Sequence, residues 1–194
     1  MSKSQRAFKR FFDVVLGLLL FPILIIPIIL LIILASIDTR SYGMFKQQRV
    51  GQHASLFNIY KIRTLRNEKH HLGQLSKSAS WFGNFLRDTK LDELPQLLNV
   101  IFGHMSFVGP RPDIKGFADE LENDDRIILL VKPGITGPAT IKYKHEDELL
   151  AKQINPEDYN RTIIWPDKVK INKNYVENWS FYLDLKYILQ SILN

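Results

Sequence analysis

The stretch that decides the fold is Arg87-Asp-Thr-Lys-Leu-Asp-Glu-Leu-Pro-Gln-Leu-Leu-Asn-Val-Ile-Phe-Gly-His-Met-Ser-Phe-Val-Gly-Pro-Arg-Pro112. It carries two adjacent carboxylates, Asp92 and Glu93, at the start of an apolar run. Apolar residues recur in this run at spacings of three and four, which is typical of one helix face: Leu91, Leu94, Leu97, Leu98 and Ile101. The run ends at Gly103, and the following Gly-Pro-Arg-Pro turn cannot continue a helix, because proline lacks an N–H and restricts the residue before it. We therefore expect acidic groups at a helix start and Arg111 in a rigid loop.

Two interpretations of Asp92 follow from this position. Thr89-Lys-Leu-Asp92 matches a capping box, in which the carboxylate stabilises a helix N-terminus and a cap contributes about 0.5–2 kcal/mol. Pro95 is best tolerated in a first helical turn, so it favours a helix that starts a few residues after Thr89. In the chemical interpretation, the helix N-terminus attracts anions and keeps Asp92 ionised as a nucleophile. Glu93 would then point about 100° away, so the pair approaches one phosphate or metal from two directions.

An apolar segment precedes this unit. No charged residue occurs from Val14 to Ile37, and roughly 24 helical residues extend about 36 Å, enough to cross a bilayer core of ~30 Å. The segment is longer than the apolar region of a secretory signal peptide, so we expect it to be retained. Pro22 and Pro27 lie within it and each removes a helix hydrogen bond.

The charges around the apolar segment leave two arrangements open. Basic residues stand on both sides of it: Lys3, Arg6, Lys9 and Arg10 before, and Arg40, Lys46 and Arg49 after. Positive charge near membrane ends marks the cytoplasmic side, so two basic flanks favour a helix that enters, breaks near Pro22 and returns. The alternative is an ordinary kinked span, because prolines are tolerated in such helices.

The remaining sequence predicts a small mixed domain. Phe45 to Thr64 is typical of two strands around a turn at Gly51, and Lys61 and Arg63 share one face of the second strand. Residues 67–80 are polar and predict a surface loop or short helix, with His70 and His71 exposed. Gly116 to Leu130 predicts a helix, as do residues 146–153 and 181–193, and Pro166-Asp-Lys168 predicts a turn before residues 169–179. The aromatic residues of 81–85 fit either core packing or a membrane interface, and the last helix fits core packing with partial membrane contact.

Composition narrows the class of protein. The chain has 194 residues, a net charge of +6 and no cysteine, which excludes disulfides, cysteine-ligated zinc and a cysteine nucleophile. A basic balance suits anionic lipids, phosphorylated substrates or nucleic acid. The basic residues are scattered among 20 acidic ones and form no concentrated stripe, so we expect no nucleic-acid partner.

The order of motifs along nearly the whole chain resembles the bacterial sugar transferases, the monotopic polyprenyl-phosphate phosphoglycosyl transferases in their short form. The motifs are Lys9-Arg-Phe-Phe-Asp13, Gln48-Arg-Val-Gly51, Phe57-Asn-Ile-Tyr-Lys-Ile-Arg-Thr64, Leu91-Asp-Glu-Leu-Pro-Gln96, Asn99, Met105-Ser106, Val108-Gly-Pro-Arg-Pro112, Pro133-Gly-Ile-Thr-Gly137 and Pro166-Asp-Lys168. Each motif is weak alone, and in this order they are specific. Pro138-Ala139 and His104 depart from the family's usual residues.

The resemblance implies an α+β, mostly helical fold: a re-entrant membrane hairpin broken at Pro22 within residues 1–40, and a catalytic domain with amphipathic surface helices, residues 41–194. That domain would lie on the cytoplasmic face of the bacterial inner membrane. The implied reaction moves a phosphosugar from a UDP-sugar to undecaprenyl phosphate through a covalent intermediate on Asp92, releases UMP and initiates glycan assembly. Glu93 would assist the Mg²⁺ ion or a proton, with the metal placed on Asp92.

Four basic residues are the candidate phosphate and nucleotide contacts, in falling order: Arg87, Arg111, Lys61 and Arg63. Homo-oligomerisation is left open. Three other classes compete with the transferase: a membrane-tethered binding module, a metal-dependent hydrolase that uses water as acceptor, and a structural anchor. Only the two enzyme classes explain both the Asp92-Glu93 pair and the rigid Gly-Pro-Arg-Pro turn.

Overall fold

The computed structural model describes residues 1–66 and 78–193. The predicted polar loop 67–80, with His70 and His71, lies almost entirely outside the described residues. The helices are α1 Lys3–Thr39, α3 Trp81–Asp88, α4 Gln96–Ile101, α5 Pro138–Lys142, α6 Glu146–Ala151, α7 Pro156–Tyr159, α8 Trp165–Glu177 and α9 Phe181–Leu193. The strands are β1 Met44–Val50, β2 Leu56–Ile62, β3 Ser106–Val108 and β4 Gly134–Thr136. Short 3₁₀ segments are η1 Gln52–Ala54, η2 Leu91–Glu93, η3 Ala118–Glu120 and η4 Asn123–Leu130, and η5 Asn160–Ile164 is a π-helical turn. The architecture is therefore mostly helical α+β, as predicted.

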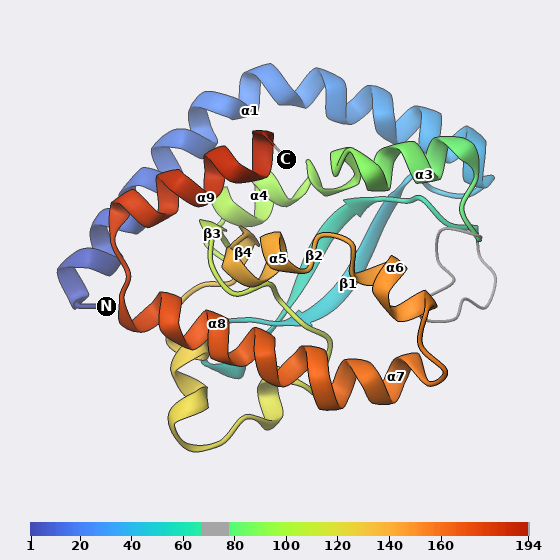
Figure 1. Cartoon of the computed structure of the whole chain (residues 1–194). Helices are drawn as coiled ribbons and strands as arrows, with labels where there is room; N and C mark the ends of the chain where they lie inside the picture. The colour runs from blue at the N-terminus through green and yellow to red at the C-terminus, as the bar shows by residue number, and fades with distance from the viewer. Residues whose placement is uncertain (67–77, 194) are drawn as a thin grey trace.

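The long helix α1 dominates the upper side of the molecule (Figure 1). It begins at a capping box made by Ser2 and Gln5 and ends at Arg40 in the left-handed region. Both Pro22 and Pro27 lie inside this one helix, which curves over the domain (Figure 1). The expected break at Pro22 into two helices is therefore not seen. A proline removes one hydrogen bond and bends a helix, and the remaining turns hold it together.

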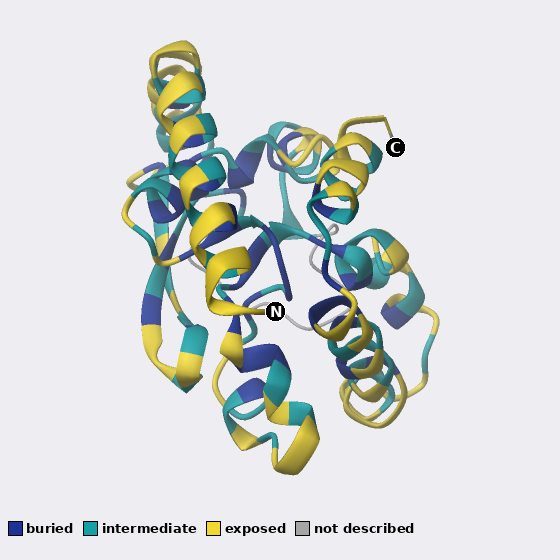
Figure 2. Ribbon diagram, turned by 90° about the vertical axis from the view of Figure 1, so that its left-hand side faces the viewer, coloured by how far each residue is buried: buried dark blue, intermediate teal, exposed yellow. Residues whose placement is uncertain are grey.

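Helix α1 lies against the rest of the chain along its whole length. Its buried residues run from one end to the other: Lys9, Asp13, Gly17, Ile28, Ala35 and Thr39. Its outer face is apolar and exposed, through Phe8, Phe11, Val15, Leu18, Leu19, Ile23, Ile26, Ile29, Leu30, Ile33, Leu34 and Ile37. Figure 2 shows this contrast on the helix that begins at N. Among the described residues, α1 is the one helix long and apolar enough to cross a membrane.

Strands β1 and β2 form the predicted antiparallel ribbon. Phe45 pairs with Lys61 and Val50 with Leu56, so the chain reverses at Gly51. A side chain on Gly51 would lie 2.8 Å from the Phe57 ring, which explains glycine at this turn. The ribbon is joined to α4 by Asn99, which is fully buried, accepts from Tyr60 N at 3.2 Å and donates to Asn58 O at 2.7 Å.

A second, parallel pair of strands, β3 and β4, joins the segment after α4 to the C-terminal helices. Ser106 pairs with Gly134 and Val108 with Thr136. Helix α8 packs on this pair through an apolar cluster of Val108, Val131, Tyr175, Val176 and Trp179, and α9 packs against the cluster through Phe181, Tyr187 and Ile188.

A buried ion pair attaches α9 to α1. Lys9 Nζ lies 2.5 Å from Asp184 Oδ2, and both side chains are almost completely buried. Asp184 also accepts from Tyr175 OH at 2.5 Å and from Trp179 Nε1 at 3.1 Å. Burial, and then the negative charge of Asp184, raise the pKa of Tyr175. A buried charge needs such partners, so this cluster joins the two ends of the chain.

Three local predictions are wrong. Pro166-Asp-Lys168 does not form a turn, because it lies in the first turn of α8, where proline is well tolerated. The segment from Gly116 to Leu130 is not one helix, because Leu121 and Glu122 are extended and separate η3 from η4. The capping box at Thr89 is not formed either: the Thr89 hydroxyl donates to Phe85 O at 2.7 Å and belongs to the end of α3.

The aromatic cluster of residues 81–85 divides between surface and core. Trp81 and Phe85 are exposed and stack on each other, with ring centroids 6.1 Å apart. Phe82 packs on the buried cluster that contains Leu86.

Candidate active site

The two adjacent carboxylates lie in the 3₁₀ turn η2, between α3 and α4. Lys90, with φ 58°, reverses the chain after α3 and directs η2 inward. Asp92 and Glu93 are therefore buried, at 7% and 6% exposure. Leu94 and Pro95 keep helical dihedral angles, so the backbone stays helical from η2 into α4. This agrees with the prediction that the carboxylates stand at the start of the helical run.

Glu93 is held by two of the predicted phosphate-binding residues. Its Oε1 accepts from Lys61 Nζ at 3.0 Å and from Arg111 Nη2, and its Oε2 accepts from Arg111 Nη1 at 3.2 Å. Burial alone would raise the pKa of Glu93, but the positive charges of Arg111 and Lys61 outweigh it and hold that pKa well below its usual range. Glu93 therefore stays ionised and fixes the two cations in place.

Asp92 differs from Glu93 in its hydrogen bonds and in the direction of its pKa shift. Its Oδ1 is buried and has no hydrogen-bond partner among the described residues. Burial raises the pKa of Asp92, Lys61 opposes this increase, and the like charge of Glu93 adds to it. An orphaned buried oxygen is costly and calls for a functional explanation. The pair thus contains one carboxylate occupied by cations and one with an oxygen available to a ligand or an electrophile.

Asp92, Glu93, Lys61 and Arg111 form one charged cluster. The other two predicted basic residues lie outside it. Arg87, at the end of α3, pairs with Asp147 of α6 at 2.5 Å. Arg63 donates from Nε to Tyr42 O at 2.9 Å and lies over the Phe45 ring, 5.4 Å from its centroid. Because Phe45 faces Lys61 across the ribbon, Arg63 is on the same side of the ribbon as Lys61 but one step further along.

A second group of charges, which the sequence did not single out, continues the cluster behind Arg111. Burial raises the pKa of Asp113 to about 6, against the opposing charges of Lys168, Arg49 and Arg111. Lys168 Nζ also lies 2.6 Å from Glu146 Oε2. Arg49 and Lys168 occur in two of the motifs that suggested the family, and that placement was the available signal. Nothing in the sequence marked Asp113 apart from its place after Pro112.

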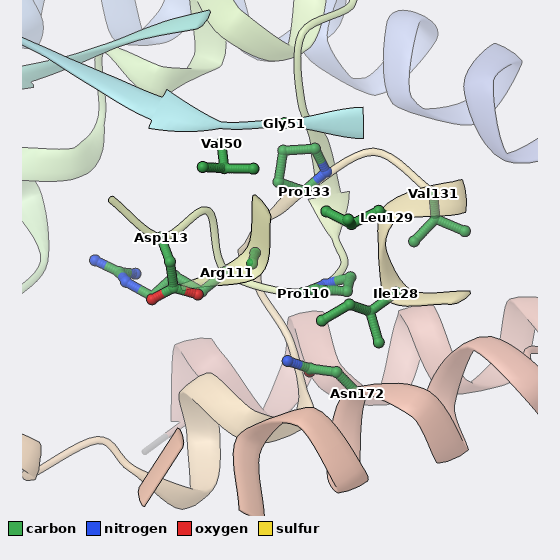
Figure 3. A pocket seen from close by; sticks show the side chains of 11 residues that line it. Val50, Gly51, Pro110, Arg111, Asp113, Ile128, Leu129, Val131, Pro133 and Asn172 are labelled. Atoms are coloured by element: carbon green, nitrogen blue, oxygen red, sulfur yellow. The ribbon is translucent and has the colours of Figure 1, made fainter. Parts of the chain in front are cut away.

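The loop that carries Arg111 is shaped by close backbone packing. A side chain on Gly109 would lie 2.5 Å from Lys132 O and 2.9 Å from Gly134 N. Behind the loop is a cavity of about 20 Å³, and Asn172 points toward it from α8 (Figure 3). This volume suits one water molecule and is far too small for a sugar nucleotide. The charged cluster around Asp92, not this cavity, is the candidate active site.

The candidate site offers few side chains that could ligate a metal ion. Among residues 1–66 and 78–193 there is no group of three or more side chains of the kinds that ligate metals. Mg²⁺ often binds through one or two carboxylates together with substrate phosphates. The unpartnered Oδ1 of Asp92 fits such an ion, whereas both oxygens of Glu93 are taken by cations.

Comparison with known proteins shows the family of this chain. The profile described as bacterial sugar transferase matches residues 4–194. The chain belongs to the bacterial sugar transferase family.

Three relatives illustrate the range of this family. The "Uncharacterized sugar transferase EpsL" of Bacillus subtilis (strain 168) is 34% identical over 187 residues, which cover 95% of this chain and 85% of that protein. The "UDP-glucose:undecaprenyl-phosphate glucose-1-phosphate transferase" of Klebsiella pneumoniae is 35% identical over 95% of this chain and 39% of its own length. The "Undecaprenyl-phosphate galactose phosphotransferase" of Salmonella typhimurium (strain LT2) is 34% identical over 97% and 40%. The chain thus spans about two fifths of the longer sugar transferases.

Proposed function

We propose that this chain transfers a sugar 1-phosphate from a UDP-sugar to undecaprenyl phosphate and so initiates the assembly of a cell-surface polysaccharide. The observation that carries the proposal is the buried Oδ1 of Asp92, which has no hydrogen-bond partner within residues 1–66 and 78–193, beside a fully paired Glu93. The family and the names of its relatives support the substrate classes.

Asp92 is the proposed nucleophile. One of its carboxylate oxygens attacks the sugar-bearing phosphorus of the UDP-sugar, and the bond from that phosphorus to the UMP oxygen breaks. UMP leaves with the electron pair, and the phosphosugar remains on Asp92. An oxygen of undecaprenyl phosphate then attacks the same phosphorus, and the bond to Asp92 breaks. Two covalent steps let a soluble donor and a lipid acceptor use one site in turn.

The positive charges around Asp92 suit this chemistry. Lys61 and Arg111 lie beside the carboxylates and oppose the raised pKa of Asp92, which favours its ionised, nucleophilic form. Arg111 is partly exposed, with 36% of its side chain accessible, so it can meet a diphosphate while Glu93 holds it. Arg87 is the next candidate, and Arg63, which contacts Tyr42 and Phe45, is the last. Asp92 would hold Mg²⁺ through Oδ1, and a bound ion supplies charge neutralisation of the diphosphate.

Helix α1 is proposed to be a re-entrant membrane segment, with the catalytic domain on the cytoplasmic face. Asp13, near its start, accepts from Ser106 Oγ at 3.1 Å, and Ala35, near its end, packs with Ile62 and Leu86. A straight span would carry one end of α1 away from the domain, so contacts at both ends favour entry and exit on one side.

Other apolar side chains support the same placement. Helices α3, α4 and α9 lie along α1 (Figure 1), and they expose Trp81, Phe102, Tyr182, Leu189, Ile192 and Leu193. A surface this apolar is typical of an interface with lipid. We place residues 1–40 in the membrane segment and 41–194 in the catalytic domain, which brings Asp92 close to the lipid headgroups.

The test is UMP release by detergent-solubilised protein with Mg²⁺, with and without undecaprenyl phosphate. UDP-glucose, UDP-galactose and UDP-N-acetylgalactosamine form the donor panel. We expect turnover that requires the lipid, and without it an intact-mass increase equal to one phosphosugar. Asp92→Asn should abolish both signals, and Asp88→Asn, the same change at an exposed position four residues earlier, should retain them. UMP release over many turnovers without lipid, beyond the single equivalent that forms the adduct, would indicate a hydrolase. Activity in Asp92→Asn would exclude Asp92 as the nucleophile.

A further inference from the structure

The motif Lys9-Arg-Phe-Phe-Asp13 contacts the two segments that carry the active site. One is α4, which follows Asp92 and Glu93, and the other is β3, which leads to the Arg111 loop. Arg10 makes the first contact, donating from Nη1 to Val100 O at 2.6 Å and from Nη2 to Ile101 O at 2.8 Å. These carbonyls belong to the last turn of α4, where helix carbonyls lack the usual partner four residues on; Val100 O also accepts from Gly103 N at 3.0 Å. Lys132 Nζ donates to the neighbouring Gly103 O, and burial together with the charge of Arg10 lowers the pKa of Lys132. Arg10 therefore holds the end of the helical run that starts with Asp92 and Glu93.

Asp13 makes the second contact, one helical turn further along α1. It is 2% exposed, and its Oδ1 accepts from Ser106 Oγ and from Phe107 N, both at 3.1 Å. Ser106 and Phe107 begin β3, and only three residues separate Phe107 from Arg111. Two of the residues that follow β3 are prolines, which limit the freedom of the loop. A shift at Asp13 therefore passes through a short, stiff segment to Arg111.

These contacts close a ring through the active site. Arg10 contacts the end of α4, and the chain before α4 leads back to Glu93. Glu93 accepts two hydrogen bonds from Arg111. The chain before Arg111 leads back through β3 to Asp13, which lies one turn from Arg10 on α1. We propose that Arg10 and Asp13 are positioning residues, which set the distance between Asp92 and the Arg111 loop. This inference rests on the proposed function. It assigns to the start of the membrane helix a part in the geometry of phosphoryl transfer.

A simpler role for Arg10 is that of one positive charge among several that orient the membrane segment. Lys3 allows the two roles to be separated. It belongs to the same basic flank, but it is exposed and contacts neither α4 nor β3. A charge lost at either position changes the flank equally. Only a change at Arg10 releases the α4 carbonyls.

The first measurement separates kcat from KM, using the donor of the panel above that the wild type turns over. Misplacing reacting groups by about 1 Å can cost about 100-fold in rate. We expect Arg10→Gln and Asp13→Ala to lower kcat about 10- to 100-fold and to change KM for the UDP-sugar less than threefold. Lys3→Gln should stay within twofold of wild type. Asp13→Asn retains an oxygen that can accept from Ser106 and Phe107, and it should recover most of the rate.

The second measurement needs no substrate, so it decides the inference even if the proposed reaction is wrong. Hydrogen exchange of the solubilised protein is followed by mass spectrometry in peptides covering 98–104 and 105–111. In Arg10→Gln we expect faster exchange in both peptides, although Arg10 touches only the first. Arg10→Lys, which keeps the charge but loses the two-nitrogen fork that reaches both carbonyls, provides the same test if the glutamine variant does not fold. Faster exchange in 98–104 alone, or an equal loss of kcat in Lys3→Gln, would overturn the proposal.

Discussion

Replacing Glu93 by glutamine is the sharpest test of how the active site is held together. The change keeps the size of the side chain and removes its charge. Asp92, Glu93, Lys61 and Arg111 carry two negative and two positive charges, so the variant leaves a buried cluster with a net charge of +1. The new amide also places a donor where Lys61 and Arg111 donate.

The expected loss of stability follows from this geometry. Removing one partner of a buried ion pair costs about 3–5 kcal/mol. The Arg111 side chain is 36% exposed, so solvent screens part of its charge and we reduce the figure to about 2–4 kcal/mol. One kcal/mol shifts Tm by about 2–4 °C in a chain of this size, which predicts a decrease of about 5–15 °C.

A thermal melt of the purified protein in detergent measures this effect. The matched control is Glu148→Gln, the same chemical change at a side chain that is 71% exposed, and its Tm should stay within about 1 °C of wild type. If Glu93→Gln melts within about 2 °C of wild type while kcat collapses, our reasoning is refuted. Glu93 would then act in the chemistry, on a proton or a metal, and would not hold the two cations.

Three further perturbations test separate parts of the structure. Lys61→Met removes a positive charge that lowers the pKa of Asp92, so the acidic limb of the pH–kcat profile should move to higher pH, and a limb that stays or moves down would contradict this. Asp113 binds its proton more tightly when folded, with a pKa raised from 3.8 to about 6, so the wild type should lose up to about 3 kcal/mol as pH rises from about 4 to 6. Asp113→Asn should flatten that dependence of Tm on pH, and an unchanged slope would argue against a buried titrating carboxyl. Lys9→Met leaves Asp184 buried without its cation and should destabilise the fold by about 3 kcal/mol in thermal melts, whereas an unchanged Tm would show the pair to be dispensable.

Much of the site was accessible from local sequence patterns. The spacing of apolar residues after Leu91 located the helical run, and the position of Asp92 and Glu93 at its start agrees with the structure. The ribbon around Gly51 followed from extended-strand patterns and a turn residue.

Other features depended on contacts that no local pattern specifies. Arg111 and Lys61 were expected to meet phosphate, and the structure places both on Glu93. Arg87 has Asp147 as its partner, and a pairing across 60 residues leaves no local trace. Pro22 was expected to break α1, but proline's local preference is outweighed because packing against the domain supports the helix on both sides of it.

The sequence by itself determined the class of fold, the apolar N-terminal helix, the place of the Asp92-Glu93 pair and the resemblance to a family, because these depend on periodicity, spacing and motif order. Only the tertiary structure decided that Glu93 is fully paired while Asp92 Oδ1 has no partner in the described part of the chain, and that Asp13 reaches Ser106 across 93 residues. The physical reason is that a buried charge is stabilised by whichever partners packing brings within about 3 Å. Packing joins segments that are remote in the chain.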